Sequence, residues 1–450
     1  MFKDKEFTRA LFKLSYPIAI YYLVINLTRF LDLMMVGQLG DLPVAAMGLA
    51  DQIFFLLELL MFGIANGSAV LMSQFWGVKD VKGIRNVLGL CLGLSLGGSL
   101  LIGGAAVLFP RQILSIYSND AIVQELGSQY LRVVGFSYIA VAFTSSFNAI
   151  LRSVHHVKLP MTVIACSLAL DVLLCYALIF GRFGLPAMGL MGAAFGISIA
   201  RVVEGVAMVV AAYLTHTPAA ASFGELTGAS PALVQKFIKV SMPVVVNEIV
   251  WSLGFTMYKV AYAHINTDAI AAINIISTIE ELTFVPFVGM IFGSAVLIGN
   301  NIGAGNINKA NTYAKRTIFL CVFGALILGG VILLNVDRIL YLYNISPITK
   351  EYARNTLLVF ASLFWIRVIN MAVIVGIIRS GGDTRFSLIT ELCTMWLVGV
   401  PLAFLGVFVF HLPVYWVYCL VLLEEVVKAL VGLTRFISKR WIHDLVRQPV

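Results

Sequence analysis

Charged residues are scarce in this chain of 450 residues. They make up 12% of it, whereas soluble domains average about 25%. Hydrophobic residues make up 60%, and the mean hydropathy is +0.95. We therefore expect an integral membrane protein that lies almost wholly in the bilayer. The net charge of +8 does not indicate nucleic-acid binding, because the basic residues lie in short loops between apolar runs.

The sequence also lacks the motifs of disulfide-rich, metal-binding and catalytic proteins. Its six cysteines fall inside apolar runs without a CxxC pair, which favours buried packing over disulfides or metal ligation. The six histidines show no ligand spacing, and the loops contain neither a P-loop nor a cluster of catalytic side chains. The N-terminus leads into a full-length span without a signal-peptide cleavage site. We expect no enzyme activity, no metal and no cofactor.

Apolar runs long enough to cross a bilayer occur twelve times, since a spanning helix needs about 20 such residues. The predicted fold class is all-α and integral to the membrane. The predicted spans cover residues 16–36, 46–75, 87–109, 129–151, 159–180, 187–214, 240–263, 270–300, 314–334, 354–378, 386–409 and 411–434.

The orientation follows from lysine and arginine, which are enriched in cytoplasmic loops. Counting loops alternately from the N-terminus, one side receives 20 of these residues and the other side receives 6. The bias is consistent from loop to loop. We expect both termini to be cytoplasmic and the protein to lie in the cell membrane.

The second half of the chain repeats the first. The stretch GSAVLMSQFWG (67–77) is matched by GSAVLIGNNIG (293–303), and KLSYP (13–17) is matched by KVSMP (239–243). Both pairs have the same offset of 226 residues. A constant offset indicates a duplication rather than chance similarity between apolar helices.

The duplication predicts two six-helix bundles, residues 1–215 and 240–450, joined by a cytoplasmic linker at 216–239. An even number of spans per half gives both halves the same orientation, which is the parallel-repeat arrangement of several transporters. Duplicated six-span halves are more often carriers than enzymes or scaffolds, although a fold alone does not define a function.

Four stretches resemble signatures of the multidrug and toxic compound extrusion (MATE) transporters. They are LDLMMVGQLGDLPVAAMGLA, LALDVLLCYALIFG, GSAVLIGNNIGAGNINKA and GIIRSGGDTRFS. The resemblance runs from end to end and implies two six-helix bundles with cation-driven export of organic, often cationic, drugs. Two positions depart from the family pattern. Val368 stands where some members have a tenth-helix aspartate, and Ser167 stands where members with a fifth-helix aspartate often have asparagine.

Two aspartates in apolar runs, Asp32 and Asp171, are the candidates for cation coupling. Acids within the membrane are costly and functional by default, and both belong to the first bundle. If they face each other, they could share a proton or a small cation. The alternative for Asp32 is a helix end near outer water. The alternative for Asp171 is an ion pair with Arg201, which lies at nearly the same depth.

Candidates for contact with a substrate lie on several spans. Ser167 shares a helix face with Asp171, Tyr138 could line the same pocket, and Asn26 precedes Asp32 on the first span. Glu248 could attract a cationic substrate, or it could be a solvated residue in an inner vestibule.

Other charged residues in the spans are expected to pair. Glu280 and Arg367 fall at similar depth and predict an ion pair. Glu424 and Lys428 have the i,i+4 spacing of a helix pair.

The leading hypothesis is a monomeric secondary antiporter. It would export an organic, cationic or amphipathic compound in exchange for H⁺ or Na⁺ by alternating access. A lipid-linked saccharide flippase of a related fold is the alternative within transport. That function calls for a strongly basic cavity, whereas acids outnumber bases in the spans. A polytopic enzyme would need a catalytic cluster, and a scaffold would not need paired intramembrane acids.

Overall fold

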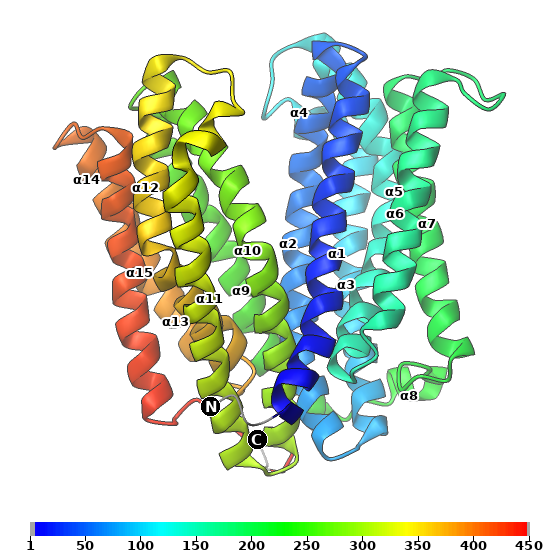
Figure 1. Ribbon diagram of the computed structural model, residues 1–450. Helices are drawn as coiled ribbons and strands as arrows, with labels where there is room; N and C mark the ends of the chain where they lie inside the picture. The colour runs from blue at the N-terminus through cyan, green and yellow to red at the C-terminus, as the bar shows by residue number, and fades with distance from the viewer. Residues whose placement is uncertain (1–4, 448–450) are drawn as a thin grey trace. The chain divides into compact units, whose positions relative to one another are not determined.

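The computed structural model describes residues 5–447, and long helices dominate this part of the chain (Figure 1). Two short helices, α4 (Pro110–Leu114) and α8 (Phe223–Thr227), lie between the long ones. The long helices of the first half are α1 (Lys5–Gly37), α2 (Asp41–Gly77), α3 (Val81–Leu108), α5 (Ala121–Ser153), α6 (Lys158–Phe180) and α7 (Leu190–Leu214). The helices of the second half are α9 (Pro231–Ala263), α10 (Thr267–Gly303), α11 (Ile307–Tyr341), α12 (Pro347–Asn370) with η1 (Met371–Ile378), α13 (Thr384–Thr394) with η2 (Met395–Gly399) and α14 (Val400–Phe408), and α15 (Val414–Ile437).

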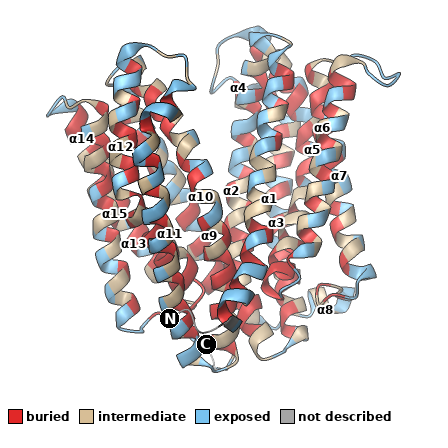
Figure 2. Cartoon of the chain, viewed as in Figure 1, coloured by how far each residue is buried: buried red, intermediate tan, exposed pale blue. Residues whose placement is uncertain are grey.

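Each predicted span coincides with one of these helices or unbroken helical runs, so the all-α membrane fold is confirmed. The spans 87–109, 187–214, 386–409 and 411–434 extend by one to three residues beyond the helix. Eleven helices of the described region are long and apolar enough to cross a bilayer. The twelfth predicted span is α15, which is as long as its neighbours but carries Glu424, Glu425 and Lys428 in its middle. Exposed segments alternate with buried ones along the long helices (Figure 2). Large apolar residues such as Leu101 and Leu334 are among the exposed ones, as expected of helices that face lipid.

The helices extend beyond the apolar runs because polar residues cap them. The side chain of Asp80 accepts a hydrogen bond from the Gly83 amide at the start of α3, and Asn266 accepts one from Ala269 at the start of α10. Such caps satisfy backbone amides that have no partner inside the helix. The predicted boundaries followed hydropathy alone and were therefore several residues short at many ends.

The chain forms two compact units that differ from the predicted halves. One unit contains Ile20–Val245, and the other contains Met1–Ala19 with Val246–Val450. The predicted boundaries placed α1 and α9 each in a single bundle, whereas the structure divides α1 after Ala19 and α9 after Val245.

Close glycine contacts explain this division. A Cβ atom at Gly67 of α2 would lie 2.7 Å from the Cα of Ser241 in α9, so this part of α9 packs within the Ile20–Val245 unit. A Cβ atom at Gly293 of α10 would lie 2.9 Å from the Oγ of Ser15 in α1. The offset of 226 residues relates Gly67 to Gly293 and Ser15 to Ser241, so the two contacts are equivalent, and each joins a residue of one repeat to a residue of the other.

Within the Ile20–Val245 unit, α5 packs beside α2, α3 and α7, and α6 packs beside α7 (Figure 1). Small residues let the backbones approach, as is common in membrane helices. A Cβ atom at Gly103 of α3 would lie 2.9 Å from the carbonyl oxygen of Gly135 in α5.

The predicted linker contains the short helix α8. Helix α8 begins with a capping box between Ser222 and Glu225, and the Arg85 Nη1 atom of α3 lies 2.8 Å from the Glu225 carboxylate. The Ser222 backbone amide and then the Arg85 guanidinium lower the pKa of Glu225 to about 2. Residues 231–239 of the predicted linker form the first turns of α9.

In the other unit, α12 packs beside α10, α11 and α15 around an aromatic core that includes Phe287 and Phe364. The segment after α15 folds back onto the loop between η1 and α13. Trp441 is fully buried against Gly381, and Arg435 is ion-paired with Asp383. Burial alone would raise the pKa of Asp383, but its contacts with His443 and Arg435 hold it below the usual range.

Candidate functional site

Asp32 of α1 and Asp171 of α6 lie together in the Ile20–Val245 unit. Their carboxylates and the Cys175 thiol each offer a ligand atom, and these atoms lie within 4.8 Å of one another. All three residues are buried. The structure thus meets the geometric condition set by the sequence, that the two aspartates face each other.

The local structure explains why Cys175 joins the aspartates. Cys175 follows Asp171 by four residues, which places both on one face of α6. The Cys175 Sγ atom lies 3.4 Å from Asp171 Oδ1. Behind it, a Cβ atom at Gly196 of α7 would lie 2.8 Å from the same sulfur, so only glycine lets α7 approach this closely. Asp32 Oδ1 is buried and accepts no hydrogen bond in the described structure.

Arg201 does not form the ion pair with Asp171 that was one of the two sequence alternatives. Its guanidinium carbon lies 3.7 Å from the centroid of the Phe54 ring, as in a cation–π contact. No ion pair within 4.0 Å joins Arg201 to Asp171 in residues 5–447, and Arg201 Nη1 lacks a hydrogen-bond partner there. The ion-pair alternative is wrong for this structure, because equal depth on two helices does not make their side chains point at each other.

Tyr138, Ser167 and Asn26 belong to the same unit. The Tyr138 ring is fully buried, with its centroid 5.6 Å from that of Phe54. Ser167 donates its hydroxyl hydrogen to the Ala200 carbonyl at 2.9 Å. Asn26 is half-buried on α1. Contact of these side chains with a substrate stays a prediction.

Sequence reasoning missed two features near Asp32. It treated Cys175 only as packing, although its i,i+4 spacing from Asp171 was visible in the sequence. It also overlooked Glu58, which forms an ion pair with Arg29, three residues before Asp32. A search for acids spaced along the apolar run of α2 would have found Glu58.

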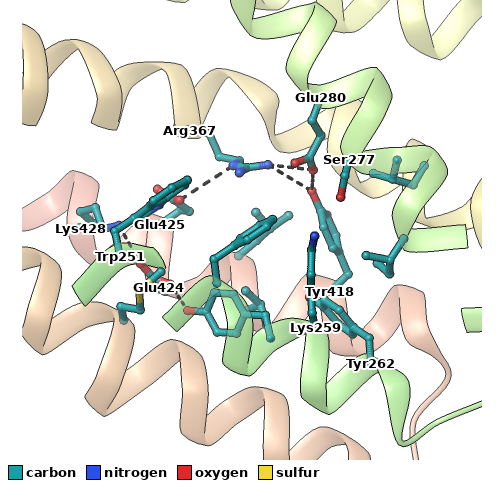
Figure 3. A pocket seen from close by; sticks show the side chains of 17 residues that line it. Trp251, Lys259, Tyr262, Ser277, Glu280, Arg367, Tyr418, Glu424, Glu425 and Lys428 are labelled. Atoms are coloured by element: carbon teal, nitrogen blue, oxygen red, sulfur yellow. Dashed lines mark hydrogen bonds and ion pairs between the residues drawn. The ribbon is translucent and has the colours of Figure 1, made fainter. Parts of the chain in front are cut away.

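The second unit contains a polar network around a cavity of about 60 Å³ (Figure 3). The Arg367 Nη1 atom lies 2.8 Å from the Glu280 carboxylate, so the predicted ion pair is confirmed. Tyr418 donates its hydroxyl hydrogen to the same carboxylate, and Glu425 lies on the far side of Arg367 with an Nε–O distance of 3.9 Å.

A second part of this network centres on Lys428. Its Nζ atom lies 2.7 Å from Glu424 and 2.9 Å from Glu391, so the predicted i,i+4 pair is confirmed and extended to α13. Tyr258 donates its hydroxyl hydrogen to Glu424. Each of these carboxylates already has a donor, which favours a structural role in tying α9, α13 and α15 together.

Glu248 is neither solvated nor free to meet a substrate in this structure. Its side chain is buried, and its carboxylate lies 2.7 Å from the Arg379 Nη1 atom. Arg379 also donates from Nε to the Ser387 hydroxyl at 3.3 Å. The solvated alternative is therefore wrong. The role of Glu248 in attracting a cationic substrate stays a prediction. A substrate would have to compete with the Arg379 guanidinium for this carboxylate.

Comparison with known proteins extends over nearly the whole chain. The MatE family model matches residues 17–177 and 243–405, two segments that begin 226 residues apart, which is the offset of the internal repeat. An uncharacterised transporter of Bacillus subtilis, YisQ, is 25% identical over 447 residues, covering 98% of this chain and 96% of that protein. A probable multidrug resistance protein NorM of Thermotoga maritima is 23% identical, covering 97% and 93%.

Solved structures show the same fold. A crystal structure of MATE in the bent conformation superimposes with a TM-score of 0.86 at 20% identity and covers 97% of this chain and 96% of that one. A transporter of the MOP superfamily from Pyrococcus furiosus gives a TM-score of 0.84 at 20% identity, with coverage of 96% and 95%. The family match spans well over half of the chain, and the protein therefore belongs to the MatE family of multidrug efflux transporters.

Proposed function

We propose that this protein is a secondary antiporter that exports an organic, cationic or amphipathic compound in exchange for inward H⁺ or Na⁺. The single observation that carries the coupling role is the proximity of Asp32 and Asp171 within a membrane-spanning unit. The multidrug resistance named for the relatives supports the substrate class. The protein would act as a monomer in the cell membrane with both termini cytoplasmic, without a cofactor beyond the coupling ion.

The physical reason for coupling lies in the cost of two buried carboxylates. Two negative charges about 5 Å apart repel strongly where water is excluded. A proton or a sodium ion shared by Asp32 and Asp171 relieves this repulsion and holds α1 against α6. Loss of the cation releases that contact. Coupling follows if the cation binds the two transport conformations with different affinity.

Transport by purified protein tests this proposal. Proteoliposomes carrying an imposed pH gradient or sodium gradient would be loaded with a panel of fluorescent organic cations. We expect one gradient to drive uphill movement of at least one cation. Movement of a lipid-linked saccharide instead, without a response to either gradient, would favour the flippase.

Site-directed labelling tests the orientation. Lys79 and Thr267 are exposed at helix ends that the charge bias assigns to opposite sides of the membrane. A single cysteine at Lys79 should react with an impermeant reagent only from the cytoplasm, and one at Thr267 only from outside. The reverse pattern would overturn the orientation.

A further inference from the structure

The thiol of Cys175 is an unusual neighbour for a site that handles only protons or sodium. Hard cations prefer oxygen ligands, whereas thiolates select softer metals such as Zn²⁺. Burial alone does not distinguish Cys175, because Cys321 in the second unit is fully buried too. A polar contact alone does not distinguish it either, because Cys91 Sγ lies 3.5 Å from the Ser146 hydroxyl oxygen. Cys175 instead lies 3.4 Å from a carboxylate oxygen.

We propose that Asp32, Asp171 and Cys175 form a binding site for a thiophilic divalent cation, with Zn²⁺ as the physiological candidate. This proposal rests on the proposed function in one respect, since Asp32 and Asp171 would serve both as metal ligands and as the coupling site. A metal bound here would occupy the coupling site and join α1 to α6, so Zn²⁺ would inhibit export.

The distances between the donors suit this chemistry. A tetrahedral zinc ion with Zn–S near 2.3 Å and Zn–O near 2.1 Å places its ligand atoms about 3.6 Å apart. The Asp171–Cys175 separation of 3.4 Å already fits. The triad as a whole, within 4.8 Å, needs a closure of about 1 Å, which side-chain rotation can supply.

Asp32 gives an independent indication that a ligand belongs here. The residue is only 6% exposed, and Oδ1 accepts no hydrogen bond in the described structure. A buried carboxylate oxygen without a partner is costly and calls for an explanation. A cation bound to this oxygen would be the missing partner.

Binding would proceed without any redox step. The thiol proton leaves to solvent as the sulfur–metal bond forms, and the two carboxylates bind through oxygen. Three protein ligands leave the fourth tetrahedral position for water, as in open zinc sites.

The test uses Co²⁺ as a spectroscopic probe on the purified full-length protein, prepared without a polyhistidine tag. Thiolate ligation of Co²⁺ gives a ligand-to-metal charge-transfer band in the near ultraviolet. We expect one equivalent to bind and Zn²⁺ to displace it. Cys175→Ser should abolish the band, and the matched control Cys321→Ser should retain it. Asp32→Asn and Asp171→Asn should each weaken binding at least about tenfold.

Absence of the band at millimolar Co²⁺, or its survival in Cys175→Ser, would refute the metal site. Thermal unfolding of each variant shows whether it remains folded. If Cys175→Ser does not remain folded, the loss of Co²⁺ binding by Asp32→Asn tests the metal site instead. Binding is measured without a gradient, so the two proposals can fail separately. If the Asp32→Asn variant loses Co²⁺ binding but keeps uphill export, the coupling role of Asp32 is refuted and the metal site is supported.

Discussion

Replacement of Glu248 by glutamine distinguishes a structural role from a substrate-binding role. The side chains of Glu248 and Arg379 are 10% and 6% exposed, and their charged atoms lie 2.7 Å apart. Removing one charge of a buried pair leaves the other without compensation and costs about 3–5 kcal/mol. For a cooperative unit of roughly 150–250 residues, each kcal/mol lowers the Tm by about 2–4 °C, so we expect a decrease of about 6–20 °C.

Thermal unfolding of the purified protein in detergent measures this effect. The matched control is Glu351→Gln, which neutralises an exposed glutamate of α12 and should leave the Tm unchanged within about 2 °C. The double variant Glu248→Leu/Arg379→Leu removes both charges. It should recover most of the lost stability, because no uncompensated buried charge remains.

Transport assays test the alternative role of Glu248, which is binding of the substrate. If Glu248 binds the substrate, Glu248→Gln should weaken export of cationic compounds more than that of neutral ones while the Tm stays near that of the wild type. That combination would refute the structural interpretation. A lowered Tm with equal losses for cationic and neutral compounds would support it.

Two further predictions concern the folded linker. Gly89→Ala in α3 should detach α8, because the new Cβ would lie 1.8 Å from the Leu226 carbonyl oxygen, whereas Gly93→Ala has open space and should be silent. Protease cleavage within 216–230 should therefore increase only in Gly89→Ala, and equal cleavage of both variants would contradict the contact. Glu225 has a folded pKa of about 2, below its usual 4.5. Its stabilising contacts with the Ser222 amide and with Arg85 are therefore complete above that usual value and are lost as the pH falls toward 2. Protease access to the linker of the wild type should therefore increase as the pH falls over this range. In Glu225→Gln, access should be high at all these pH values. Access that does not change with pH in the wild type would contradict these contacts.

The helices of this protein could be predicted from sequence because a chain in hydrocarbon must satisfy its backbone internally. Every long apolar run is helical for that reason. The repeat was also predictable, since a duplication preserves its offset, and the paired contacts of Gly67 and Gly293 follow it. The division of α1 and α9 between units was not predictable, because it depends on contacts between residues far apart in the sequence.

The site was predicted in part. The cost of burying charge identified Asp32 and Asp171, and periodicity placed Ser167 on the same helix face as Asp171. The same periodicity applies to Cys175, which had been assigned to packing. Depth along a helix does not give the direction of a side chain around it. The predicted Arg201–Asp171 pair was wrong for this reason, because Arg201 points toward Phe54. The partner of Glu248 was hidden because Arg379 lies 131 residues further along the chain.

The central claim is that Asp32 couples a cation to export, and one measurement tests it most directly. Uphill export would be measured per molecule of inserted protein in proteoliposomes for the wild type, for Asp32→Asn, and for Asp41→Asn as a control at the exposed start of α2. Asparagine is nearly isosteric with aspartate, so insertion should survive. We predict that Asp32→Asn loses gradient-driven export but keeps equilibrium binding of the substrate, while Asp41→Asn behaves as the wild type. Uphill export by Asp32→Asn at the wild-type rate would contradict the account and leave Asp32 without a role in transport.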